Sequence, residues 1–97
     1  MKTPEKYVKD DVAAYLKGIG AYVVKPATFG YGGSGAPDRV CCFAGRFIGI
    51  EVKREGKTPT ALQHRRLKEI HATGGVAIWG DSSEKIIEQL KAALGLP

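Results

Sequence analysis

The segment Pro37–Lys53, with the sequence PDRVCCFAGRFIGIEVK, decides the fold predicted for this chain. It contains two apolar runs, residues 37–43 and 47–53, on either side of Ala44-Gly45-Arg46. Two β-branched and aromatic runs around a short glycine-containing break are typical of a β-hairpin. Side chains alternate between the two faces of a strand. Glu51, Lys53 and Gly49 therefore share one face of the second strand, and the other face is apolar (Ile48, Ile50, Val52).

The register of this hairpin predicts a pair of carboxylates. A turn centred on Ala44-Gly45 places Asp38 opposite Glu51, and opposed like charges destabilise a sheet unless a cation lies nearby. Mg²⁺ prefers oxygen ligands and takes one or two carboxylates. Lys53 follows Glu51 on the same face, about 6.7 Å along the strand, and a metal with an ammonium group would bind a phosphate. A one-residue slip would separate the carboxylates, and Ala-Gly leaves a longer loop open.

The same residues also allow a purely structural interpretation. An aspartate beside proline is common in turns, and Glu-x-Lys on a strand is often a solvated face. Gly49, beside Glu51, favours the functional interpretation, because a glycine inside a strand often marks close approach of a ligand or another backbone.

Pro37-Asp38, a short spacer and then Glu51-Val52-Lys53 resemble the signature of the PD-(D/E)xK nuclease superfamily. The lead-in Gly35-Ala36-Pro37-Asp38, the compact hairpin and Gln63 on the following helix most resemble its VRR-NUC branch. The resemblance covers residues 1–97 as one nuclease domain. It implies an α/β fold with a restriction-endonuclease-like core, in the order αβββαβ, with a mixed central sheet flanked by helices and a C-terminal helix. It also implies a structure-selective DNA endonuclease that depends on Mg²⁺ or Mn²⁺ and acts as a homodimer on Holliday junctions or other branched DNA.

The resemblance gives roles to individual residues. Asp38 and Glu51 would bind the metal, with the Val52 carbonyl and Glu5 as candidate further ligands. Lys53 would orient the attacking water or stabilise charge on the phosphate, and Gln63 would hold that water or a phosphate oxygen. A structural alternative to each of the last two roles stays open. In these alternatives, the Glu5 carboxylate only interacts favourably with the dipole of its helix, and Gln63 only caps its own helix.

Composition supports a nucleic-acid partner. The 97 residues carry a net charge of +5 and give a pI near 9.4, which favours nucleic acid first and an anionic membrane second. No apolar run is long enough to span a membrane, and the N-terminus lacks a signal peptide. We therefore expect a cytoplasmic protein of a bacterium or a phage-infected cell, without a membrane partner or a small-molecule cofactor. Cys41 and Cys42 are expected to be small buried residues, not a disulfide or a zinc site.

Basic residues gather around the predicted metal site. A charge run is usually a solvated helix face, but next to a metal site it favours phosphate contacts. The glycine-rich loop 28–36 leads into a strand, so it is not a dinucleotide-binding loop. It is either a plain surface loop or one that contacts DNA through Phe29 or Tyr31. The predicted nucleic-acid contacts are Tyr31, Arg39, Arg54, Lys57, His64, Arg65, Arg66 and Lys68.

The remaining elements follow from periodicity and capping signals. Helices are expected after Thr3-Pro4 and over residues 59–73 and 83–94, and strands over residues 21–25 and 76–79, the last parallel to its neighbour. The first helix should bury Val8, Val12, Tyr15, Leu16 and Ile19, and the second Leu67, Ile70 and His71. Two alternative functions remain: a non-catalytic or partner-dependent nucleic-acid-binding module, and a less selective DNA or RNA nuclease.

Overall fold

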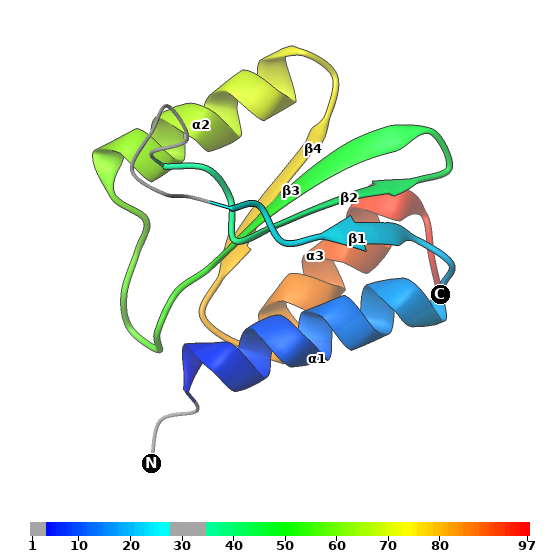
Figure 1. The fold of residues 1–97 in the computed structure, drawn as a ribbon, viewed down its shortest axis with the longest axis horizontal. Helices are drawn as coiled ribbons and strands as arrows, with labels where there is room; N and C mark the ends of the chain where they lie inside the picture. Colours follow the sequence, from blue (N-terminus) through cyan, green and yellow to red (C-terminus); the bar gives the residue numbers. More distant parts are fainter. Residues whose placement is uncertain (1–3, 28–34) are drawn as a thin grey trace.

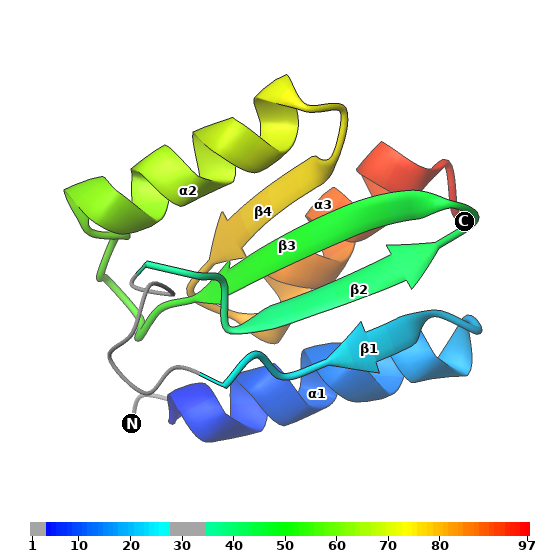
Figure 2. The ribbon, with the colours of Figure 1, turned by 45° about the horizontal axis from the view of Figure 1, so that its top comes forward.

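The predicted hairpin lies at the centre of a four-stranded sheet in the computed structural model, which describes residues 4–27 and 35–97. Two helices lie on one face of this sheet and one on the other (Figures 1 and 2). The strands follow the order β1-β2-β3-β4; β1/β2 and β2/β3 are antiparallel, and β3/β4 is parallel. The elements are α1 (Glu5–Gly18), β1 (Tyr22–Val24), β2 (Arg39–Phe43), β3 (Arg46–Val52), α2 (Ala61–Ala72), β4 (Val76–Gly80) and α3 (Ser83–Leu94).

The hairpin has the predicted register. Phe43 pairs with Arg46, and Arg39 pairs with Ile50, so the next position places Asp38 opposite Glu51. Ala44 and Gly45 form the two-residue turn with φ values of 52° and 78°. Turns with two positive φ values match the twist of the flanking strands. The fit to this twist explains why Ala44 adopts a conformation that costs a residue with a Cβ some energy.

One face of β3 forms the centre of the core. Ile48, Ile50 and Val52 are at most 1% exposed. They pack with α1 and α3; in the predicted stripe of α1, Val8, Val12 and Leu16 are buried, whereas Tyr15 and Ile19 are only partly buried. Residues three or four apart on a helix share a face, which gives the cluster Val8, Val12, Leu16, Ile86 and Leu90, joined by Cys41, Val76 and Ile78.

The prediction that both cysteines are buried was wrong for Cys42. Cys41 faces the core, and burial raises the pKa of its thiol to about 11. Cys42 points to the other face and is exposed; both cysteines are free thiols. Neighbouring strand residues must point to opposite faces, and α2 contacts β3 and β4 but leaves the β1–β2 half of its face uncovered.

Within residues 4–27 and 35–97, the α2 face of the sheet therefore has a half that α2 covers and a half without a covering helix. On the covered half, Gly49 lies against Ile70 and Pro37; a Cβ built on Gly49 would lie 2.6 Å from Ile70 Cδ1. Tyr22, Cys42 and Phe47 form one cross-strand row that runs from the uncovered half onto the start of β3. Tyr22 is 73% exposed and Phe47 is 49% exposed. The small residue predicted to admit a ligand or a backbone instead admits a helix side chain and a proline.

The helices differ from prediction in detail. α2 begins at Ala61 behind the N-cap Thr60, two residues later than expected, and His71 is exposed instead of facing inward. α3 has the predicted range, with the Ser82 hydroxyl accepting a hydrogen bond from the Lys85 amide. No helix in the described part of the chain is long and apolar enough to cross a membrane.

Candidate active site

Asp38 is fixed at the point where the β2–β3 ladder ends. Its Oδ2 accepts a hydrogen bond of 2.8 Å from the Val52 amide, in the position that a further β2 residue would otherwise occupy. The carbonyl of Asp38 accepts from Arg39 Nη1 at 2.8 Å, and the preceding Pro37 is buried. Backbone and side-chain contacts together hold one Asp38 oxygen in place and leave Oδ1 for another partner.

Glu51 is a buried charged residue whose environment does not fully satisfy it. Its side chain is 3% exposed. Oε1 accepts a hydrogen bond of 2.9 Å from Gln63 Nε2. No donor in the described part of the chain contacts Oε2, which is also buried. A buried carboxylate oxygen without a donor costs about 1–3 kcal/mol or more, so this oxygen marks a position where a cation or a proton is needed.

The pKa of Glu51 reflects this environment. The pKa of Glu51 is raised from 4.5 to about 8, first by burial and then by the negative charge of the neighbouring Asp38 carboxylate. The positive charges of Lys53 and Lys9 act in the opposite direction. Like-charged carboxyl groups at one site cannot both ionise cheaply, so in the absence of a metal Glu51 keeps its proton to a higher pH than an exposed glutamate does.

Gln63 connects Glu51 to Lys53. Its Oε1 accepts from Lys53 Nζ at 3.3 Å and from the Thr60 amide at 2.9 Å. The Thr60 hydroxyl accepts from the Gln63 amide, which completes a capping box at the start of α2. The predicted helix cap is thus present, and the same side chain also reaches the site. The two interpretations of Gln63 left open by the sequence are compatible.

Lys9, which was not among the predicted site residues, lies at the site. Its Nζ is 3.3 Å from Asp38 Oδ1 and 3.8 Å from Glu5 Oε2. Glu5 therefore contacts the site through Lys9, one helical turn away. The i, i+4 spacing was a usable signal, because a residue four positions after Glu5 lies on the same face of the helix.

Asp38 and Glu51 fit a small divalent cation. They supply two carboxylates, one with a buried oxygen that lacks a donor, and Mg²⁺ or Mn²⁺ would complete its shell with water and phosphate oxygens. In the described ranges, no three histidine, cysteine, aspartate or glutamate side chains form a cluster that could hold a metal. Val52 contacts Asp38 through its amide, and the ligand roles of the Val52 carbonyl and of Glu5 stay predictions.

The predicted nucleic-acid contacts fall into three groups. Arg39 and Arg66 are half-buried; Arg39 bonds the Asp38 carbonyl, and Arg66 pairs with Glu69 at 2.8 Å. Tyr31 lies outside the described residues, as does Phe29. The others are exposed, and His64 also packs edge-on against Trp79 with 6.2 Å between ring centroids; the exposed group is Arg54, Lys57, His64, Arg65 and Lys68.

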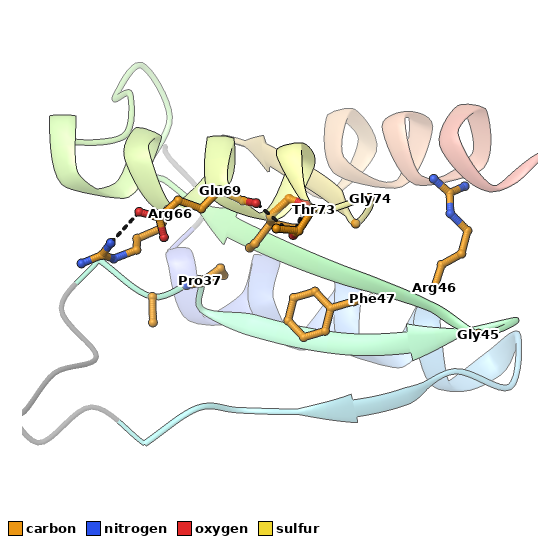
Figure 3. Close-up of a pocket in the computed structure, with 11 residues that line it drawn as sticks. Pro37, Gly45, Arg46, Phe47, Arg66, Glu69, Thr73 and Gly74 are labelled. Atoms are coloured by element: carbon orange, nitrogen blue, oxygen red, sulfur yellow. Dashed lines mark hydrogen bonds and ion pairs between the residues drawn. The ribbon is translucent and has the colours of Figure 1, made fainter.

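A pocket of about 660 Å³ lies on the same sheet face as Glu51, between α2 and the hairpin (Figure 3). Pro37, Phe47 and Ile70 are among its lining residues. The carboxylate pair does not line it. Arg46 also borders the pocket, but its guanidinium donates to the Ala93 carbonyl at 3.0 Å. The pocket therefore lies next to the carboxylate pair, because its lining residue Pro37 directly precedes Asp38, but it does not contain that pair.

Comparison with known proteins identifies the architecture. The sequence matches no family model and is similar to no curated protein. Among solved structures, one described as a "VRR_NUC domain" superposes with a TM-score of 0.77 at 24% identity, over 90% of this chain and 94% of that chain. A "VRR_NUC domain protein" superposes with a TM-score of 0.79 at 18% identity, over 100% and 93%. The fold predicted from residues 37–53 is thus confirmed: the chain has the fold of the VRR_NUC domains.

Proposed function

We propose that this chain is a nuclease that hydrolyses phosphodiester bonds in DNA with the help of Mg²⁺ or Mn²⁺. The observation that carries the proposal is the carboxylate pair: Asp38 lies opposite Glu51, one Glu51 oxygen is buried without a donor, and Lys53 is tied to Glu51 through Gln63. A bound divalent ion supplies Lewis acidity toward the phosphate and lowers the pKa of a bound water.

The chain's own residues would act as follows. Asp38 and Glu51 hold the ion, and the Val52 amide and Gln63 keep these carboxylates in place. The Lys53 ammonium, held by Gln63 Oε1, stabilises negative charge on the phosphate or orients the attacking water. The exposed basic side chains, from Arg54 to Lys68, bind the DNA backbone, which gives affinity without reading sequence.

Cleavage assays test this proposal directly. Labelled four-way junction, flap, linear duplex and single-stranded DNA are incubated with Mg²⁺, Mn²⁺ or EDTA, using wild type and Asp38→Ala. We expect metal-dependent cutting that is strongest on branched DNA and is lost in Asp38→Ala. Equal cutting of every DNA would contradict the proposed structure selectivity and support a general nuclease. Preferred cutting of matched RNA would show that RNA, not DNA, is the substrate. Binding without cutting by wild type would favour the non-catalytic module.

We also propose that the working unit is a homodimer, which would present two sites to the symmetric strands of a junction. The apolar stripe of α3 is buried in the core, so this helix is a weaker candidate interface than the uncovered sheet half with Tyr22 and Phe47. Exposed apolar patches of this kind often mark contact surfaces. The free thiols at Cys41 and Cys42 suit the reducing cytoplasm that we propose as its location.

Sedimentation equilibrium checks the homodimer. Wild type is expected at twice the 10.4 kDa mass of the chain. The double variant Tyr22→Glu/Phe47→Glu should sediment as a monomer, because two charges would have to be desolvated at the interface. Tyr7→Glu, at a 59% exposed position on α1, is the matched control and should remain dimeric. A monomeric wild type at high micromolar concentration would refute the dimer.

A further inference from the structure

The Lys9 ammonium group occupies a position beside the carboxylate pair where a metal ion could otherwise lie. Its neighbours in the helical stripe, Val8 and Val12, are 2% and 0% exposed, so the turn of α1 that carries Lys9 is anchored in the core. From there the side chain, which is 25% exposed, reaches Asp38 Oδ1 at 3.3 Å. The other Asp38 oxygen is already bonded to the Val52 amide. Lys9 thus contacts the oxygen that a metal ion at this site would need.

The two ammonium groups of the site come from opposite faces of the sheet. Lys53 is held on the α2 side by Gln63, whereas Lys9 comes from α1, which packs on the other face (Figure 1). Their roles differ accordingly. Lys53 is linked to Glu51 through Gln63 and leaves Asp38 Oδ1 free, but Lys9 contacts that oxygen directly.

We propose that Lys9 is the resident counter-ion of Asp38 and must leave Oδ1 when a divalent ion binds. The inference rests on the proposed function. An ammonium group and a divalent ion repel each other and cannot share one carboxylate oxygen at contact distance. Glu5 Oε2, 3.8 Å from Lys9 Nζ, is the partner onto which the displaced ammonium swings. Lys9 is therefore a positioning residue. Its positive charge offsets the repulsion between the two carboxylates when no metal is bound, and its competition for Oδ1 raises the metal concentration that is needed to fill the site.

Metal titration without DNA tests this competition. Mn²⁺ is titrated calorimetrically into metal-free wild type, Lys9→Met, Lys9→Arg and Lys6→Met. Lys9→Met keeps most of the side-chain volume and removes the competitor, so its Kd for Mn²⁺ should fall by about threefold to fivefold, the upper part of the range expected for removal of an ion pair near the surface. Lys9→Arg keeps the charge and should bind like wild type. Lys6→Met removes the same charge from an exposed position on the same helix and should change the Kd less than twofold.

Each result decides between defined outcomes. An unchanged or weaker Mn²⁺ affinity in Lys9→Met would overturn the inference while leaving the nuclease proposal intact. An equal gain in Lys6→Met would also overturn it, because the effect would then come from net charge alone. Asp38→Asn tests the proposed metal site itself. It should abolish Mn²⁺ binding both as a single substitution and in combination with Lys9→Met. Absence of Mn²⁺ binding by wild type would overturn the metal-dependent function together with this inference.

Discussion

Glu51→Gln is expected to make the metal-free protein more stable and to abolish the proposed nuclease activity. In the fold, Glu51 has a pKa of about 8 against an ordinary value of 4.5, mainly because of burial. The folded chain therefore binds this proton more tightly than the unfolded chain. The stabilising effect is fully present below pH 4.5, falls as the pH rises toward 8, and is absent above it. At pH 8 and above the wild type thus holds a carboxylate that the fold disfavours, by up to about 5 kcal/mol.

The amide of the Glu51→Gln variant removes this charge and retains an oxygen for the hydrogen bond from Gln63 Nε2. Urea unfolding in EDTA should show a gain of about 2–4 kcal/mol at pH 8.5 that shrinks at pH 5, where the wild type is also protonated. Cleavage with Mn²⁺ should fall at least about a thousandfold, since a neutral amide is a poor ligand for a hard cation.

The Glu51→Gln prediction is checked against a substitution of an exposed glutamate. Glu55→Gln removes a carboxylate from the exposed loop before α2 and should change neither stability nor cleavage appreciably. Equal stability of wild type and Glu51→Gln at pH 8.5 would show that the fold tolerates the ionised carboxylate. Full cleavage activity in Glu51→Gln would remove Glu51 from the proposed metal site.

Gly49→Ala is expected to destabilise the fold by about 1–3 kcal/mol, the usual cost of overpacking a core. The new Cβ would lie 2.6 Å from Ile70 Cδ1 and 3.1 Å from Pro37 Cγ. Relief of the clash requires the Ile70 side chain to leave its rotamer and Pro37 to shift, and Pro37 directly precedes Asp38. Cleavage should therefore fall as well, even under conditions where the variant is folded.

A double-mutant cycle isolates the contact. Ile70→Val deletes the δ-methyl that clashes, so Gly49→Ala/Ile70→Val should be less destabilised than the sum of the single variants by about 1 kcal/mol, measured by urea unfolding. Gly18→Ala is the matched control, since nothing lies within 4 Å of a Cβ at that helical position. Simple additivity in the cycle would show that Ile70 does not limit the space at Gly49.

The hairpin and its carboxylate pair could be predicted because they depend on local rules. Strand periodicity fixes the faces, and a two-residue turn at Ala44-Gly45 fixes the register. The position of Gln63 could also be predicted, because it lies four residues before Leu67 and therefore on the same inner face of the helix. These rules need only a few neighbouring residues, which is why they suffice for the main features of the candidate site.

The features that the sequence did not reveal depend on how whole elements pack. Lys9 reaches Asp38 only because α1 lies across the end of the hairpin, 29 residues away in the chain from that carboxylate. Cys42 is exposed because α2 covers only part of its sheet face. Periodicity assigns Cys42 and Lys9 to a face but does not say which element, if any, lies opposite.

The capping box of α2 makes the candidate site part of a larger cooperative unit. Gln63 closes the first turn of the helix and also contacts both Glu51 and Lys53. Helix ends fray at a lower free energy than global unfolding. Each opening of this turn would release the amide that holds Glu51 and the acceptor that holds Lys53 at the same time. The fraction of molecules with an assembled site is then set by the local unfolding equilibrium of one helical turn, so substitutions that only alter helix propensity near Thr60 would change activity without touching a catalytic group.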